Sequence, residues 1–255
     1  MPIPNDGWLE SSDVTPMFPT LVWKLQLKAE FHQPMDERIF AALRAQGLPD
    51  VATGRAWQSG QNLHQLDEFR DLVACVERGT RSVLRFLRIG CEAFQITGCW
   101  ANVLAKGASH RAHTHPNNFL SGAYYLCTPA GADTINFHDP RPQAGIIRPP
   151  VTALTAENTD QVVVRVKNGT LLLFPAYLQH SVDANAGEEP RISISFNVMF
   201  SGFAENLSKP LWQRPRRAPT PRPSMQDLCY APPPPSLLAA LLRDWSPKLG
   251  AALSG

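Results

Sequence analysis

Residues 169–200 read GTLLLFPAYLQHSVDANAGEEPRISISFNVMF and contain two strand-like apolar runs separated by turn-forming residues. The first run ends at Pro175, and the second alternates apolar and polar residues, as a strand with one buried face does. Similar short runs, broken by Gly, Pro, Asn and Asp, occupy 98–105, 111–116, 119–127, 133–138 and 161–166. Many short strands at this spacing are typical of a sandwich or barrel rather than of βαβ units.

The segment before these strands has a different pattern. Residues 18–27 predict a strand, whereas 35–46 and 66–88 carry apolar side chains at helical spacing. Helices followed by many strands predict an α+β protein whose sheets form a jelly roll. No GxGxxG or GxxxxGK[ST] motif is present, so the sequence gives no sign of a nucleotide site.

Proline is unevenly distributed along the chain. The sequence has 24 Pro in 255 residues, and nine of them fall between Pro210 and Pro235. Proline lacks a backbone donor and fixes φ, so this stretch predicts a semi-extended arm. We therefore expect a body at 1–205 and an extension at 206–255, in which 236–245 forms a short amphipathic helix suited to a homodimer contact.

Composition excludes several classes of protein. A net charge of +2 argues against a nucleic-acid binder, and no apolar run reaches the ~18 residues that a membrane span needs. The first residues show no secretory signal pattern. The five Cys have no CxxC spacing, which predicts reduced thiols and a cytoplasmic location.

Three histidines have spacings suited to metal binding. If 111–116 is a strand, His113 and His115 share one face with Cα atoms about 7 Å apart. His180 follows the strand that ends at Pro175. Converging imidazoles can hold one divalent ion. Histidines on a solvent-exposed face are the alternative that spacing alone leaves open.

Arg191 begins the alternating run RISISFNV, on the same strand face as Ser193. A charged residue at the start of a half-buried strand needs an anionic partner, because burying it unpaired is costly. A guanidinium matches a carboxylate with two parallel hydrogen bonds, and a nearby hydroxyl can add another. The pattern predicts a carboxylate clamp; a structural arginine at a strand end is the alternative.

Taken in order, these residues resemble the Fe(II)/2-oxoglutarate-dependent oxygenases, and most of all the bacterial and phage branch of that superfamily. The resemblance covers about 17–200. It rests on MFPT (17–20), WQS (57–59), HTHP (113–116), LSGAYYL (120–126), FHDPR (137–141), LFP (173–175) and the block from His180 to Arg191.

The resemblance implies a double-stranded β-helix (jelly-roll) core with N-terminal supporting helices and a Pro-rich C-terminal extension. It implies that His113, His115 and His180 bind Fe(II) at the open end of the core. His115 stands where the superfamily usually has Asp or Glu, so a carboxylate such as Asp139 is the alternative third ligand. We expect Asp139 to pair with Arg141, and His110 and His138 to lie on the surface.

The resemblance also implies a cosubstrate site. Arg191 and Ser193 would bind the distal carboxylate of 2-oxoglutarate, with help from Tyr125 (or Tyr124, which points to the other face) and Asn102. The implied activity is that of a dioxygenase, most simply a hydroxylase, which uses O2 to oxidise a small-molecule or peptidyl substrate.

Two other functions compete with this interpretation. A three-histidine cupin-type dioxygenase would use iron and O2 without 2-oxoglutarate and would not need Arg191 with Ser193. A catalytically silent jelly-roll binding protein would not need the three histidines to converge. A zinc hydrolase is a more distant option, because imidazole also suits zinc.

Overall fold

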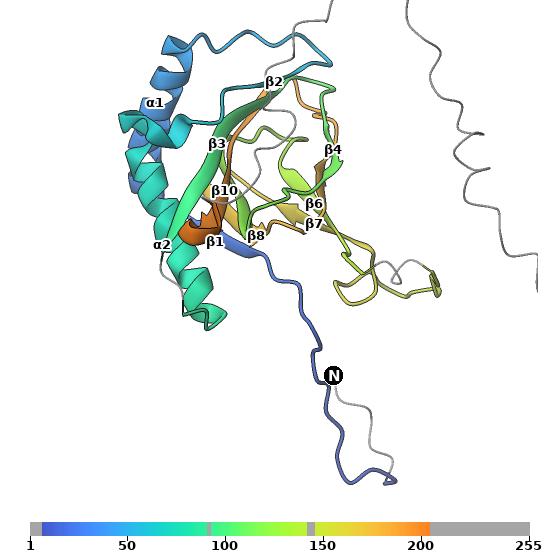
Figure 1. Cartoon of the computed structure of the whole chain (residues 1–255). Helices are drawn as coiled ribbons and strands as arrows, with labels where there is room; N and C mark the ends of the chain where they lie inside the picture. Colours follow the sequence, from blue (N-terminus) through green and yellow to red (C-terminus); the bar gives the residue numbers. More distant parts are fainter. Residues whose placement is uncertain (1–6, 91–92, 142–145, 205–255) are drawn as a thin grey trace, which may run out of the picture. The chain divides into compact units, whose positions relative to one another are not determined.

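The computed structural model describes residues 7–90, 93–141 and 146–204, and within them the chain forms two antiparallel sheets (Figure 1). The larger sheet has the order β1 (Trp23–Gln26), β8 (Thr170–Pro175), β5 (Leu120–Cys127), β10 (Arg191–Phe200), β3 (Phe94–Leu104) and β2 (Ala56–Gln58). The smaller sheet has the order β4 (His110–His113), β9 (His180–Val182), β6 (Thr134–His138) and β7 (Gln161–Arg165). These two sheets are the pattern expected of a jelly-roll core.

Two helices pack on the outer face of the larger sheet, on the side away from the smaller sheet (Figure 1). They are α1 (Ala29–Ala45) and α2 (Arg70–Phe86), joined by a segment that holds β2 and the 3-10 turns η1 (Leu63–Gln65) and η2 (Asp67–Phe69). A last short helix, α3 (Ser201–Ala204), follows β10. No helix in the described ranges combines the length and the apolar character that a bilayer crossing requires.

Two apolar clusters lie on opposite faces of the larger sheet. On β10, Ile192, Ile194 and Phe196 belong to the cluster that packs against the helices. Arg191 and Ser193 point the other way and are nevertheless 3% and 6% exposed. Because side chains alternate along a strand, these two polar groups lie on the other face of β10, which points toward the smaller sheet. We call this face of the larger sheet the inner face.

The two adjacent tyrosines of β5 are separated by the same alternation. Tyr125 packs in the cluster between the sheets, whereas Tyr124 packs on the helix side. The Tyr124 hydroxyl donates to Asp36 at 2.6 Å, and the other Asp36 oxygen lies 2.8 Å from His32 Nδ1. Burial raises the pKa of Asp36 above its usual value, and the hydrogen bonds to Tyr124 and His32 offset only part of this rise. Tyr124 therefore anchors α1 to the sheet and is not available to a ligand on the inner face.

Several predicted elements have different bounds in the structure. The helix predicted at 35–46 begins earlier, at Ala29, and includes Pro34 close to its start, where the missing N–H is tolerated. The strand predicted at 111–116 ends at His113. The short strands β2 and β9 were not predicted, because three residues are too few to show a period. The arm at 206–255 and its helix at 236–245 lie outside the described residues.

Gly122 is expected to tolerate no side chain. A Cβ at this position of β5 would lie 2.3 Å from the Leu172 carbonyl oxygen and 2.3 Å from the Phe196 ring. Since neither the β8 backbone nor a fully buried ring can give way cheaply, Gly122→Ala should lower the free energy of unfolding by about 2–4 kcal/mol. Chemical denaturation measures this change. Gly90→Ala, with no atom within 4 Å of the added Cβ, is the matched control, and equal stability of the two variants would contradict the packing described.

Candidate metal centre

Strand pairing in the smaller sheet brings two distant histidines together. Strand β4 pairs with β9 so that His113 lies directly opposite His180, sixty-seven positions later in the sequence. The two rings are 4.4 Å apart between centroids. His180 is 6% exposed and also contacts the rings of Phe137 and Phe174, which hold it against the apolar interior.

His115 completes the cluster from the loop after β4. Its ring lies 5.0 Å from that of His113 and 5.2 Å from that of His180. The prediction that His113 and His115 share one strand face is wrong in its reasoning, because β4 ends at His113. Instead, the His115 N–H donates to the Ala176 carbonyl at 2.9 Å, and the Trp100 ring packs 5.7 Å from the imidazole. The loop thus positions His115 by long-range contacts.

The three histidines can present nitrogen atoms to a single ion. One nitrogen from each of His113, His115 and His180 lies within 4.8 Å of the others. Ligands of one such ion, each bound at about 2.1 Å, lie at most about 4 Å apart. Small ring rotations would close the difference.

Hydrogen bonds orient two of these rings for metal binding. His113 Nδ1 lies 2.7 Å from the Arg111 carbonyl, and His180 Nδ1 lies 2.9 Å from the Leu178 carbonyl. A carbonyl can only accept, so in the neutral rings Nδ1 carries the proton and Nε2 is an available base. Main-chain acceptors of this kind fix the orientation of metal-binding histidines.

The surroundings keep two of the rings neutral. Burial is the main cause that lowers the pKa of His180 to about 4 and the pKa of His115 to about 3, and the charges of the neighbouring histidines lower both further. An unprotonated imidazole is the form that binds a metal. These two imidazoles are therefore in the form that can bind a metal at neutral pH.

The metal-free protein should lose stability as pH falls from 7 toward 4. Unfolded histidine titrates near pH 6.5, whereas the pKa values of His180 and His115 are about 4 and about 3 in the folded chain. Between these values the unfolded state binds more protons, so the free energy of unfolding rises with pH. Denaturant titrations of wild type and His180→Asn at pH 7, 6 and 5 test this. The variant should show the shallower dependence, and parallel profiles would contradict the assignment.

Arg191 is a buried cation without a carboxylate partner. Among the described residues no ion pair includes it, its Nε has no hydrogen-bond partner, and it donates a long hydrogen bond of 3.3 Å to the Thr134 carbonyl. Its guanidinium carbon lies 5.1 Å from the centre of the Tyr125 ring. Burial lowers the pKa of Arg191. Because an unpaired buried charge is costly, this arrangement suits an anionic ligand.

The other predicted cosubstrate residues surround Arg191 in different ways. Ser193 pairs with Tyr125 on one side and with Asn102 on the other. Tyr125 is fully buried, its hydroxyl has no hydrogen-bond partner, and burial raises its pKa against the opposing effect of Arg191. Asn102 instead donates to the Ser195 hydroxyl at 2.9 Å. Tyr125 therefore has an unused polar group beside Arg191, whereas the Asn102 amide is engaged within the sheet.

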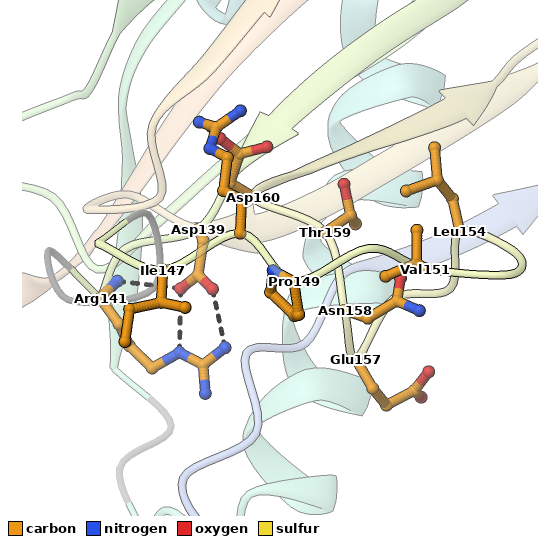
Figure 2. A pocket seen from close by; sticks show the side chains of 11 residues that line it. Asp139, Arg141, Ile147, Pro149, Val151, Leu154, Glu157, Asn158, Thr159 and Asp160 are labelled. Carbon is orange, nitrogen blue, oxygen red and sulfur yellow. Dashed lines mark hydrogen bonds and ion pairs between the residues drawn. The ribbon is translucent and has the colours of Figure 1, made fainter.

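Asp139 lies apart from the histidine cluster and is already paired. Arg141 donates to its two carboxylate oxygens at 3.0 and 2.7 Å, which lowers the pKa of Asp139 (Figure 2). The two residues line a cavity of about 640 Å³ formed by the β6–β7 connection, together with apolar side chains such as Ile147, Val151 and Leu154. Among the described residues, the cluster able to hold a metal consists of the three histidines, and Asp139 is not part of it. The ion pair expected from the sequence is present.

Two residues near the centre were missed or misplaced by the sequence. His110 was expected on the surface, but it is half-buried and its ring contacts that of His113 at 6.3 Å. Trp100 was not predicted to lie near the centre, although it packs against His115. The inward position of Trp100 could have been read from its even spacing with Asn102. No local signal identifies His110, because the β4–β9 pairing is irregular between His110 and His113.

Comparison with known proteins agrees with this geometry. A family described as "Putative 2OG-Fe(II) oxygenase" matches residues 98–197, a range that contains the three histidines, Arg191 and Ser193. No curated protein matches the sequence.

Similar solved structures share the fold at low identity. The carbocyclase SnoK from nogalamycin biosynthesis has 13% identity and a TM-score of 0.54, with 74% of this chain and 87% of SnoK covered. The epimerase SnoN from the same biosynthesis has 16% identity and a TM-score of 0.51, covering 71% and 79%. A prolyl-4-hydroxylase from Pseudomonas putida has 14% identity and a TM-score of 0.51, covering 72% and 94%.

The family match over residues 98–197 and the shared fold agree with each other, and the matched range contains the histidine cluster and Arg191. Residues 98–197 are thus similar to the 2OG-Fe(II) oxygenases, and the chain shares the fold of these solved structures.

Proposed function

We propose that this enzyme binds Fe(II) through His113, His115 and His180 and uses 2-oxoglutarate as cosubstrate to hydroxylate, or otherwise oxidise, an organic substrate. The observation that carries the proposal is a buried arginine that has no carboxylate partner within 7–90, 93–141 and 146–204 and lies in the same interior as three convergent imidazoles. The first feature calls for an anionic ligand and the second for a metal. A dicarboxylate that also binds the metal would satisfy both.

The charge of the site supports this choice of ligand. Three neutral imidazoles leave the full charge of a divalent ion uncompensated, and Arg191 adds another positive charge nearby. Bound cations are often the largest local charges in such a site. No carboxylate among the described residues offsets Arg191, so a dianion would be attracted more strongly than by a site with an acidic metal ligand.

The chain's own groups would then have distinct tasks. Arg191 would bind the distal carboxylate, Ser193 and Tyr125 would add hydroxyl donors, and the apolar contacts of His180 would keep water out. Bound Fe(II) with 2-oxoglutarate would supply the oxidising chemistry with O2, which no side chain here can supply. The similar structures are an epimerase, a carbocyclase and a prolyl-4-hydroxylase, so their reactions differ, and hydroxylation is the simplest of the oxidations that fit this site.

Arg191 also separates this proposal from a three-histidine dioxygenase that works without 2-oxoglutarate. Such an enzyme would need the metal cluster but would have no use for a buried guanidinium without a partner. A zinc hydrolase would likewise leave Arg191 unexplained. These alternatives differ from the proposal in one measurable property. Only the proposed enzyme should bind 2-oxoglutarate, and it should do so only when the metal site is filled.

The test is anaerobic addition of Fe(II) and then 2-oxoglutarate to the metal-free protein. A visible charge-transfer absorption band should appear only when both are present, and calorimetry should give one metal and one 2-oxoglutarate per chain. Succinate in place of 2-oxoglutarate is the control, because it lacks the keto group and should give no band. Stoichiometric Fe(II) binding with no band and no heat on adding 2-oxoglutarate would exclude the proposal.

A further inference from the structure

His110 is a histidine near the candidate centre to which the proposed function assigns no task. It begins β4, lies opposite Val182 of β9, and its ring meets the His113 ring edge-on at 6.3 Å. Val182 belongs to the apolar cluster between the two sheets. The His110 ring is thus half-buried at the edge of the interior.

An irregularity in strand pairing explains this position. His110 and His113 are three residues apart, so in a regular strand their side chains would point to opposite faces. The register of the β4–β9 ladder shifts between His110 and His113. A shift of this kind lets two residues of one strand oppose fewer on its partner and re-aims a side chain. The shift brings both rings to one side, where they touch.

His110 contacts His113 of the metal cluster and is near enough to Arg191 to feel its charge. Burial lowers the pKa of His110, and the charges of His113 and Arg191 lower it further. The charge of His110 in turn contributes to the lowered pKa of His180. The orphaned Nε of Arg191 and the orphaned hydroxyl of Tyr125 occupy the same inner region. No hydrogen bond to the His110 ring is found in the part of the chain that the structure describes. Arg191, its neighbour Tyr125 and His110 therefore each have a donor to offer.

We propose that His110 is a third cosubstrate-binding side chain, whose ring N–H donates a hydrogen bond to a carboxylate oxygen of bound 2-oxoglutarate alongside Arg191 and Tyr125. This inference rests on the proposed function, since the ligand is the cosubstrate of that same site. An imidazole carries at least one N–H in every tautomer, so the role needs no change of protonation. It predicts that His110 sets affinity for the cosubstrate but not for the metal.

The test is calorimetric titration of 2-oxoglutarate into the full-length, Ni(II)-loaded protein, which needs no turnover. His110→Leu removes the donor at similar bulk and should raise the Kd for 2-oxoglutarate by about 10-fold or more, as expected for a lost hydrogen bond to a charged group. His110→Gln retains a side-chain N–H and should stay within about 3-fold of wild type on the same scale. The Kd for Ni(II) should be unchanged in both.

His138→Leu is the matched control. His138 lies on the same sheet, but its ring is engaged with the Ser181 hydroxyl at 2.9 Å, so its loss should leave the Kd for 2-oxoglutarate unchanged. His110→Met, without branching, is a second donor-free variant in case the Leu variant fails to fold.

Three results would overturn the inference. The donor-free variants could bind 2-oxoglutarate as tightly as wild type, the Gln variant could lose as much affinity as the Leu variant, or the variants could lose Ni(II) instead. If wild type itself bound Ni(II) but not 2-oxoglutarate, the proposed function would fail as well. The failure of the inference alone is recognised by wild type binding both ligands normally.

Discussion

The Arg191→Met variant is expected to bind 2-oxoglutarate at least 100-fold more weakly than wild type while remaining as stable or becoming more stable. Methionine has a similar length but no charge, so it removes the proposed carboxylate clamp. Truncating one partner of a buried charge pair costs a factor of this size or more in binding. Calorimetry on the Ni(II)-loaded protein measures the affinity, and denaturant titration of the metal-free protein measures the stability.

The stability result separates a binding arginine from a structural one. In the free protein, Arg191 is 3% exposed, has an unsatisfied Nε and forms no ion pair in the described ranges. Replacing an uncompensated buried charge with an apolar side chain is often neutral or stabilising. A structural arginine would instead make the Met variant clearly less stable, and that outcome would contradict the assignment.

Arg191→Lys is the charge-conserving comparison. An ammonium is a compact point charge and lacks the planar fork that pairs with both carboxylate oxygens. We expect an intermediate loss of affinity for 2-oxoglutarate, about 10-fold. If Lys and Met lost affinity equally, geometry and not charge would dominate the clamp; if Lys matched wild type, the site would require charge alone.

Loss of His180 is expected to have the largest effect on the metal. His180→Ala removes the most buried of the three imidazoles, so the Kd for Ni(II) or Fe(II) should rise at least 100-fold. Mutation of residues that only hydrogen-bond to a metal ligand already costs 10–100-fold in metal affinity, so loss of a ligand itself should cost at least as much. Competition with a coloured chelator under anaerobic conditions measures the change, and 2-oxoglutarate should then give no charge-transfer band.

A control from the same sheet shows whether this effect is specific. His138→Ala removes a histidine that bonds to Ser181 and lies outside the cluster. Its metal affinity should match that of wild type. Retention of metal within about 3-fold by the His180 variant, on a scale where 1.4 kcal/mol is tenfold, would show that the three-histidine centre is not the binding site.

The sequence predicted the larger features of the fold because they depend on local periodicity. Alternation along 191–200 placed Arg191 and Ser193 on one face and Ile192 and Ile194 on the other, and the structure agrees. The opposite directions of Tyr124 and Tyr125 follow from the same period of two. A strand's alternation is a property of its own backbone, so no tertiary contact was needed to infer it.

The contacts of the candidate site were less accessible to such reasoning. His115 was correctly predicted to lie beside His113, but not because the two share a strand face, since β4 ends two residues before His115. A hydrogen bond to Ala176 and a contact with Trp100 place it instead. His110 was expected on the surface because no role was evident for it, and a strand period of two could not have anticipated the shift in pairing register. Both outcomes depend on partners far away in the sequence.

By itself, the sequence determined which residues could act: three histidines, one arginine and the strand faces that carry them. The tertiary structure alone decided which of these meet. It paired His113 with His180, anchored Tyr124 to Asp36 and paired Asp139 with Arg141, and among the described residues it gave Arg191 no carboxylate partner. The reason is that side-chain direction is a local property of the backbone, whereas convergence and the absence of a partner depend on strands joined across long stretches of chain.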